Sequence, residues 1–228
     1  MSRFTSTGLG WLAVLALSSF GPQASAQEVD LPQAGDDGPM SLERAIAGRH
    51  SVRSYTERGL ELEQIGQLLW AALGITVDGV SGPTRAAPSA GGLYPLRAYV
   101  VVGQASGVEP GVYRYAPERH RLERLRDGDV RDDLARAALG QRAVGEAPCV
   151  VVLGADYEVT RRRYGERGAE RYVHMDAGHA AQNVLLQAVA LGLGAAPIGA
   201  FDDAAVARLL RMDTEPLYLI PVGYPRGR

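Results

Sequence analysis

Apolar residues recur along the chain at two different spacings, which predict helices in some segments and strands in others. Helical spacing is clearest in one segment, where the apolar positions are Leu62, Ile65, Leu68, Leu69 and Leu73. Gly74 follows this segment and predicts its end. Residues 96–102 and 150–153 are apolar runs that predict buried strands, and residues 112–115 and 121–125 alternate as the arms of a hairpin do.

The remaining patterned segments complete a mixed set of elements. Helices are predicted over residues 43–48, 129–139, 174–193 and 202–212, a last strand over 217–222, and a loop over 76–92. Ser41 precedes the first of these helices as an N-cap. Small residues surround most of the segment 174–193, which predicts a helix buried against a neighbour. Because helices and strands are interspersed without a regular strand–helix–strand alternation, the predicted fold class is α+β.

Residues 1–26 have the pattern of a secretory signal peptide. Arg3 precedes an apolar run over residues 9–20, and Ala24-Ser25-Ala26 offers small residues for cleavage near Ala26. The run is shorter than a stable membrane span, so we expect no membrane anchor in the mature chain, and the alternative is a buried N-terminal helix. The expected organisation is a signal peptide over 1–26, a flexible linker over 27–40 and one domain over 41–228, in an exported, periplasmic protein.

Composition narrows the classes of function. The 228 residues carry a net charge of −2, which gives no indication of a nucleic-acid partner. The chain has no lysine, which excludes a P-loop, and no G-x-S-x-G motif of a serine hydrolase. The four histidines lack the spacing of metal ligands, so no metal is expected. The single cysteine, Cys149, lies in an apolar run and is expected to be a structural thiol.

Arg49, Ser51 and Arg53 alternate in a short polar segment after the first predicted helix. A guanidinium is a planar fork of donors that matches a phosphate, and a serine hydroxyl adds a small donor. Taken alone, such a run is also typical of a solvated basic loop. Arg226 and Arg228 end the chain, where a solvated tail is the alternative interpretation.

Two glycine-rich loops contain residues that let backbone N–H groups approach a flat ligand closely. The first is Pro88-Ser89-Ala90-Gly91-Gly92-Leu93-Tyr94-Pro95, which precedes a predicted strand. The second, residues 192–201, follows the predicted long helix and includes Pro197-Ile198-Gly199-Ala200. An ordinary turn before a strand and an ordinary helix end are the alternative interpretations.

Five segments, in this order, resemble the nitroreductase-like FMN flavoproteins, and most closely the SagB-type dehydrogenases among them. The segments are Arg49-x-Ser51-x-Arg53, the loop 88–95, Asp176-Ala177-Gly178-His179-Ala180-Ala181-Gln182-Asn183, Gly192-Leu193-Gly194 with Pro197-Ile198-Gly199, and Val222-Gly223-Tyr224-Pro225. The resemblance covers residues 41–228. It implies an α+β fold with a central, mostly antiparallel sheet. It also implies an intertwined homodimer, with FMN at the subunit interface and the long small-residue helix in the dimer core.

The resemblance also implies roles for individual residues. Arg49, Ser51 and Arg53 would hold the FMN phosphate and ribityl chain or the pyrimidine edge of the flavin, and Arg226 or Arg228 would complete the phosphate site. The flavin would be lined from the other subunit by Pro88, Ser89, Ala90 and Gly91. The residues expected over the flavin near N5 are Pro197, Ile198, Gly199 and Ala200, with the N–H of Gly199 or Ala200 donating to N5.

The expected activity is that of an oxidoreductase that passes hydride through flavin N5 by a ping-pong mechanism, on a small substrate that the sequence does not identify. Azoline-oxidising relatives use a Lys–Tyr pair before the long helix, and the nearest analogues here are Arg163-Tyr164 and Arg171-Tyr172. No catalytic residue is assigned. Tyr94 and Tyr164 are candidates, with packing as their alternative role. Two other functions stay open: an exported protein that binds FMN or another small ligand without turnover, and an interaction protein whose loops are only structural.

Overall fold

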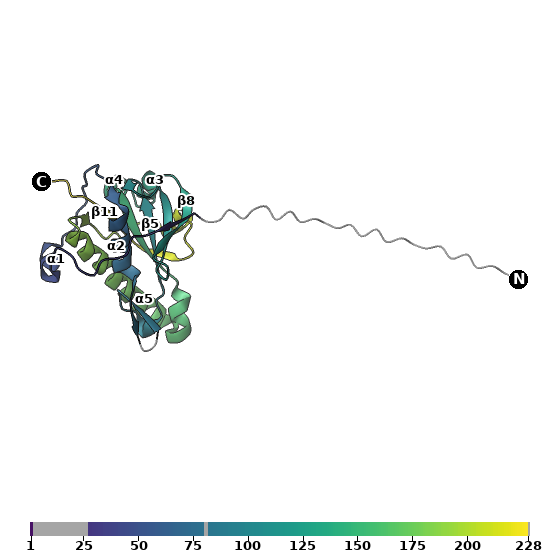
Figure 1. Ribbon diagram of the computed structural model, residues 1–228. Coiled ribbons are helices and arrows are strands. Elements are labelled where there is room, and N and C mark those ends of the chain that lie inside the picture. Colours follow the sequence, from purple (N-terminus) through teal and green to yellow (C-terminus); the bar gives the residue numbers. More distant parts are fainter. Residues whose placement is uncertain (2–26, 80–81, 228) are drawn as a thin grey trace.

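The computed structural model of the protein describes Met1 and residues 27–79 and 82–227. At its centre lies a seven-stranded sheet in the order β1–β8–β7–β5–β9–β11–β10, in which all neighbouring strands are antiparallel (Figure 1). The strands are β1 (Glu28–Asp30), β5 (Leu96–Val102), β7 (Gly111–Ala116), β8 (Arg121–Asp127), β9 (Cys149–Ala155), β10 (Gly194–Ala195) and β11 (Glu215–Gly223). This sheet, with its surrounding helices, confirms the predicted α+β class.

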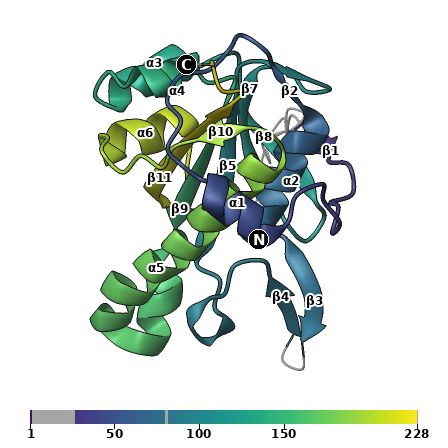
Figure 2. The same cartoon turned by 90° about the vertical axis from the view of Figure 1, so that its left-hand side faces the viewer.

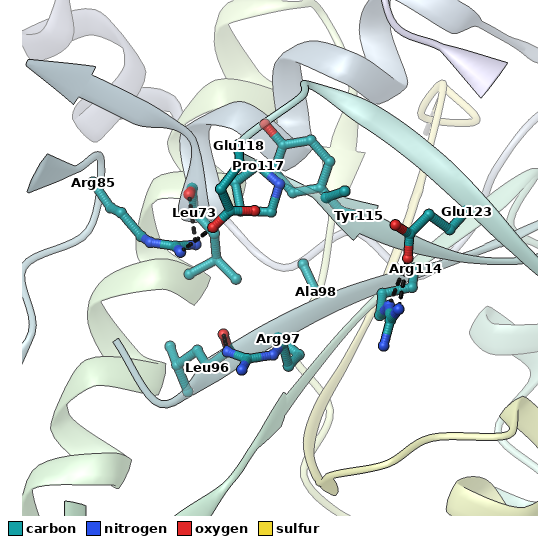
Figure 3. Close-up of a pocket in the computed structure, with 11 residues that line it drawn as sticks. Leu73, Arg85, Leu96, Arg97, Ala98, Arg114, Tyr115, Pro117, Glu118 and Glu123 are labelled. Carbon is teal, nitrogen blue, oxygen red and sulfur yellow. Dashed lines mark hydrogen bonds and ion pairs between the residues drawn. The ribbon is translucent and has the colours of Figure 1, made fainter. Parts of the chain in front are cut away.

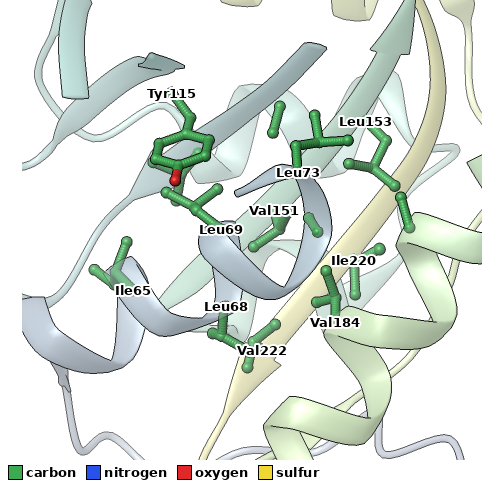
Figure 4. Close-up of a cluster of buried hydrophobic side chains, with 14 of the residues drawn as sticks. Ile65, Leu68, Leu69, Leu73, Tyr115, Val151, Leu153, Val184, Ile220 and Val222 are labelled. Atoms are coloured by element: carbon green, nitrogen blue, oxygen red, sulfur yellow. The ribbon is translucent and has the colours of Figure 1, made fainter. Parts of the chain in front are cut away.

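Helices cover both faces of the sheet, which explains why its middle strands are apolar on both sides instead of alternating. On one face, α2 (Leu62–Leu73) and α5 (Tyr157–Ala190) bury Leu68 and Val184 in one cluster with Val151 of β9 (Figure 4). The other face is covered by α3 (Arg131–Ala137), α4 (Arg142–Glu146) and α6 (Asp203–Leu210). Burial of each such aliphatic side chain stabilises the fold by about 1.5–3 kcal/mol.

α1 (Leu42–Gly48) lies against the C-terminal part of α5, on the outside of the molecule (Figure 2). It begins as the sequence predicts, because the Ser41 hydroxyl accepts a hydrogen bond from the Arg44 N–H at 3.3 Å. It carries two exposed apolar side chains, Leu42 and Ile46.

α5 begins at Tyr157, much earlier than the predicted start at residue 174. The Asp156 carboxylate caps its N-terminus by accepting the Glu158 N–H at 3.1 Å. Gly165 breaks the regular helix with φ 65° and ψ −168°, a conformation that favours glycine. The part of α5 on the N-terminal side therefore extends beyond the sheet, at the lower left of Figure 2.

Two other segments differ from their predictions. The stretch predicted as a flexible linker, 27–40, begins with β1, which pairs with β8, and it buries Leu31. The stretch predicted as a loop, 76–92, contains a hairpin of β3 (Ile75–Gly79) and β4 (Gly82–Arg85), followed by a short 3-10 turn, η1 (Ala90–Gly92). A further small sheet pairs β2 (Leu60–Glu61) with β6 (Ala105–Ser106).

The other predicted helices and strands are confirmed to within a few residues. The predicted signal peptide falls on residues 2–26, which lie outside the described residues. In the described part of the chain, no helix combines the length and the apolar character that a membrane crossing requires.

Candidate functional site

The polar segment that follows α1 runs along β10 at the edge of the sheet. Ser51 forms a parallel bridge with Ala195, and the Val52 N–H donates to the Ala195 carbonyl at 3.0 Å. A Cβ atom at Gly194 would lie 2.6 Å from the Val52 Cβ, so only glycine allows this close approach. The pairing fixes the backbone at Ser51 and, with it, the two flanking arginines.

The C-terminal segment lies antiparallel to the residues that follow this polar segment. The Thr56 N–H donates to the Tyr224 carbonyl at 2.9 Å, and the Arg226 N–H donates to the Ser54 carbonyl at 3.0 Å. The Arg226 Nε also donates to the Tyr55 carbonyl, at 3.1 Å. The chain end therefore brings Arg226 beside the segment 49–53, as the hypothesis of a shared phosphate site requires.

Tyr55 anchors these two segments to the sheet, a role that the sequence pattern did not reveal. Its hydroxyl lies 2.6 Å from the Val52 carbonyl and 3.0 Å from the Pro221 carbonyl. Burial raises the pKa of Tyr55, so the hydroxyl keeps its proton and donates. Gly223 makes room for the ring, because a Cβ at that position would lie 3.0 Å from the Tyr55 Cδ1.

Arg49, Arg53 and Arg226 form no ion pair with any carboxylate within residues 27–79 and 82–227. The Ser51 side chain is exposed beside them. Unpaired guanidiniums next to a hydroxyl are the donor set that a phosphate dianion needs. Arg228 lies outside the described residues, so its predicted part in this group is left as a prediction.

The loop 197–200 ends at the same edge of the sheet. Ile198 is buried and pairs with Leu219 through hydrogen bonds of 2.8 and 3.0 Å. Gly199 and Ala200 are exposed, and neither of their N–H groups has a partner in the described part of the chain. The Ala200 carbonyl accepts the Gln141 Nε2 at 2.8 Å, which orients the loop. The loop therefore presents two backbone N–H groups that donate no hydrogen bond within the described part of the chain.

The loop 88–91 is held by Asp176, a buried carboxylate of α5 whose role the sequence analysis missed. The Ser89 Oγ donates to Asp176 at 2.6 Å, and the Ala90 N–H donates to it at 3.4 Å. Burial raises the pKa of Asp176, and the two hydrogen bonds oppose that shift. Gly91 and Gly92 have φ values of 62° and 65°, which explains the paired glycines. The sequence did contain a signal for this role, because Asp176 is a carboxylate among the small residues of the predicted helix 174–193.

The predicted cofactor-binding residues therefore form two separate groups in one protomer. Residues 49–53, 197–200 and Arg226 gather near the C-terminal end of α5, where Gly48 contacts Val189. The loop 88–91 contacts α5 near Asp176. At 1.5 Å per residue, these two points on the helix are about 20 Å apart. A single protomer does not bring the two groups together.

The two tyrosine candidates both belong to the second group. The Tyr94 N–H donates to the Ser89 Oγ at 2.9 Å, and the Tyr94 ring lies under the Arg85 guanidinium, 5.2 Å from its centroid. The Tyr164 hydroxyl lies so close to Gly91 that a Cβ there would be 2.4 Å away. Both tyrosines thus pack on the 88–92 loop, and this placement assigns neither of them a catalytic role.

A cleft of about 290 Å³ opens between the start of β5 and the turn after β7 (Figure 3). The Arg85–Glu118 pair, at 2.9 Å, and the Arg114–Glu123 pair, at 2.7 Å, flank it, and Arg97 lies between them. Because its charges are largely paired within the protein, this cleft is a weaker anion site than the group around Arg53.

Cys149 and the histidines lie outside any cluster of metal-ligating side chains in the described part of the chain. Cys149 is fully buried and free, and burial raises the pKa of its thiol to about 12, which agrees with a structural role. Within the described ranges, no group of three or more histidine, cysteine, aspartate or glutamate side chains could hold a metal ion.

Comparison with known proteins identifies relatives of this chain. A protein from Methanocaldococcus jannaschii that carries the name of a nitroreductase is 45% identical over 196 residues, which are 86% of this chain and 96% of that protein. The trifolitoxin operon protein TfxC from Rhizobium leguminosarum bv. trifolii is 26% identical over 193 residues, and the match covers 78% of this chain and 54% of TfxC.

Solved structures show the same fold. A protein from Ralstonia eutropha, also named as a nitroreductase, has 30% identity and a TM-score of 0.76, over 90% of this chain and 92% of that one. A similarly named protein from Anabaena variabilis has 28% identity and a TM-score of 0.75, over 88% of this chain but only 42% of its own. The NADPH:FMN oxidoreductase from Vibrio harveyi, at 22% identity and a TM-score of 0.59, covers 82% of this chain and 69% of its own and shares the fold. The profile of the Nitroreductase family matches residues 46–224, and this chain belongs to that family.

Proposed function

We propose that the protein is an FMN-dependent oxidoreductase of the SagB-type branch, which acts as a homodimer on a small substrate. Family membership indicates a flavin-dependent oxidoreductase. The Vibrio harveyi neighbour is named for FMN, and the match to a trifolitoxin operon protein supports the branch. The observation that carries the proposal is the group of unpaired guanidiniums at Arg49, Arg53 and Arg226, because this donor set fits the FMN phosphate.

When bound, FMN supplies hydride transfer at its N5 atom, first with one substrate and then with a second in the same pocket. The chain's own residues bind and orient it. Arg49, Ser51 and Arg53 would hold the phosphate end, and the free N–H group of Gly199 or Ala200 would donate to the flavin N5. Asp176 holds Ser89 and Ala90 in place, and these two residues would line the flavin.

The separation of the two groups supports the proposed homodimer, because a second copy could bring its 88–91 loop to the arginines around Ser51 of the first. Exposed apolar side chains on α1 and α5 offer the surface for this: Leu42 is 62% exposed, Ile46 55% and Met175 47%. Beside them, a hollow of about 670 Å³ runs between residues 33–42, α2 and α5. Exposed apolar groups and a hollow on one side of a protein are typical of an interface.

The direct test uses the purified protein. A yellow preparation with flavin absorbance that dithionite bleaches supports the cofactor assignment, and oxidation of the reduced protein by quinones or nitroaromatic compounds supports the enzyme. A colourless protein that does not take up added FMN contradicts the proposal. A flavin-loaded protein that no reductant or acceptor cycles favours the alternative, a binding protein without turnover.

We also propose that the protein is exported to the periplasm. The support is the pattern of residues 1–26 alone. Cell fractionation and the mass of the mature N-terminus test this proposal, and an intact Met1 in a cytoplasmic fraction contradicts it. Export of an unfolded chain would require the mature protein to acquire FMN after translocation.

A further inference from the structure

The projecting N-terminal part of α5 forms a wall against the loop that we place at the flavin. The Tyr164 side chain contacts Gly91 of that loop. It also lies against Gly168, on the other side of the helix break, where a Cβ would lie 2.2 Å from the Tyr164 Cβ. The Tyr164 and Tyr172 rings meet edge to face, with centroids 5.3 Å apart. These contacts fix the segment 161–172 to the edge of the candidate site.

This segment carries an excess of free positive charge. Its exposed arginines are Arg162, Arg163, Arg167 and Arg171, and none of the four pairs with a carboxylate in the described part of the chain. Arg161 forms ion pairs with Glu158 and, at 2.8 Å, with Glu166. Glu170 is the one carboxylate of this segment outside those pairs.

The loop opposite the arginines adds no negative charge. Residues 86–96 contain no acidic side chain, and Asp176, which accepts hydrogen bonds from the loop, is buried and turned toward Ser89. The Arg163 guanidinium lies over the Tyr164 ring, 5.6 Å from its centroid, so one of the cations is held directly beside the aromatic side chain that meets Gly91.

These unpaired arginines destabilise the folded protein instead of stabilising it. Four like charges within ten residues repel each other, and none of the four forms an ion pair in the described part of the chain. Charge that faces a ligand entrance raises the local concentration of an oppositely charged ligand and its association rate. Recruitment is therefore the function that accounts for these unpaired arginines.

We propose that the substrate is a small organic anion that carries a carboxylate, and that Arg162, Arg163, Arg167 and Arg171 draw it to the site. This inference rests on the proposed function, because it places the 88–91 loop at the flavin. The arginines act by attraction and positioning and take no part in the redox step. Their planar donor forks can bind a carboxylate through two parallel hydrogen bonds.

The test compares 4-nitrobenzoate with 4-nitrobenzamide, a neutral analogue of similar shape, by calorimetric titration of the flavin-loaded protein. We expect the anion to bind at least about tenfold more tightly at low salt, and that preference to vanish at high salt. The double variant Arg167→Gln/Arg171→Gln should lose most of the preference while binding 4-nitrobenzamide as the wild type does. The control Arg142→Gln/Arg208→Gln also removes two positive charges, one from α4 and one from α6, and it should keep the preference for the anion.

The outcomes separate the two proposals. A protein that takes up no FMN overturns the proposed function, and the inference with it. Three results with flavin-loaded protein overturn the inference alone. The wild type binds both probes equally, the wild type binds neither probe, or the Arg167→Gln/Arg171→Gln variant keeps the preference for the anion.

Discussion

Arg53 shows most directly what a single residue contributes to the candidate site. Its guanidinium has no carboxylate partner among the described residues, so a bound phosphate would be its main partner. We predict that Arg53→Ala weakens FMN binding by at least about 1.5 kcal/mol, roughly tenfold in Kd, because one charged hydrogen bond is lost. Fluorescence titration of FMN against the flavin-free protein measures this.

The matched control for Arg53 is Arg142→Ala. Arg142 is 84% exposed and pairs with Glu146 on α4, so its charge is already balanced within the protein. This control should leave the FMN affinity unchanged. An Arg53→Ala variant that binds FMN as the wild type does removes Arg53 from the phosphate site.

Tyr99 gives a prediction that concerns stability alone. Its buried hydroxyl donates to Asp213 at 2.5 Å, and burial, followed by the interaction with Asp213, raises the pKa of Tyr99 to about 12. An unfolded chain releases this proton near pH 10, so between pH 10 and 12 the folded state binds more protons than the unfolded state. The free energy of unfolding therefore falls as the pH rises through this window.

Replacement of Tyr99 by phenylalanine isolates this contribution. Near neutral pH, Tyr99→Phe should destabilise the protein by about 1.5 kcal/mol, because a hydrogen bond to a carboxylate is lost. Between pH 10 and 12 the difference from the wild type should shrink, since the variant no longer has this proton to lose. Urea unfolding at several alkaline pH values measures the difference, and one that stays constant with pH contradicts the assignment.

At the scale of elements, the contact between β10 and the segment 51–53 depends on one missing side chain. A Cβ at Gly194 would meet the Val52 Cβ at 2.6 Å and both of its methyl groups at 2.7 Å. We predict that Gly194→Ala displaces this segment and destabilises the protein by about 1–3 kcal/mol. Because Ser51 and Arg53 move with the segment, FMN affinity should fall as well.

A matched glycine in open space controls for the change of residue type. A Cβ at Gly38 meets nothing within 4 Å, so Gly38→Ala should leave thermal unfolding and FMN titration unchanged. Wild-type FMN affinity in Gly194→Ala would show that the segment tolerates the shift and that the cofactor does not depend on its position.

The elements that the sequence predicts well are those with a complete local signal. The helix 62–73 has both an apolar stripe and a glycine stop, and the strand 96–102 is buried at every position except Arg97, so both are found with their predicted bounds. The first part of α5 has no apolar stripe, since it is densely charged over residues 161–171, and its start was therefore missed. The β3–β4 hairpin was missed because its glycine, proline and serine residues are equally typical of a loop.

Contacts between distant residues are the part of the site that local patterns could not give. The motifs themselves identify Ser89 and Arg53, but nothing local to Ser89 shows that Asp176, 87 positions away, accepts its hydroxyl. The same holds for Tyr55, whose hydroxyl reaches Pro221 across 166 positions. Folding brings these partners together through the order of the strands, which a single sequence does not specify.

For the whole molecule, the proposed homodimer would make assembly a condition for cofactor binding, because the two residue groups lie apart along α5. If a second copy supplies the 88–91 loop, a charge placed in the exposed apolar surface of α1 should abolish both association and FMN binding. We predict that Leu42→Glu/Ile46→Glu yields a monomer, because two buried charges without partners cost several kcal/mol at an interface. Sedimentation velocity measures the mass, and flavin absorbance measures the cofactor. The control Leu139→Glu changes an exposed side chain after α3, on the other face of the sheet, and should leave both measurements unchanged. A monomeric variant that keeps its FMN would show that one protomer is sufficient, and the 88–91 loop would then have no part in binding the flavin.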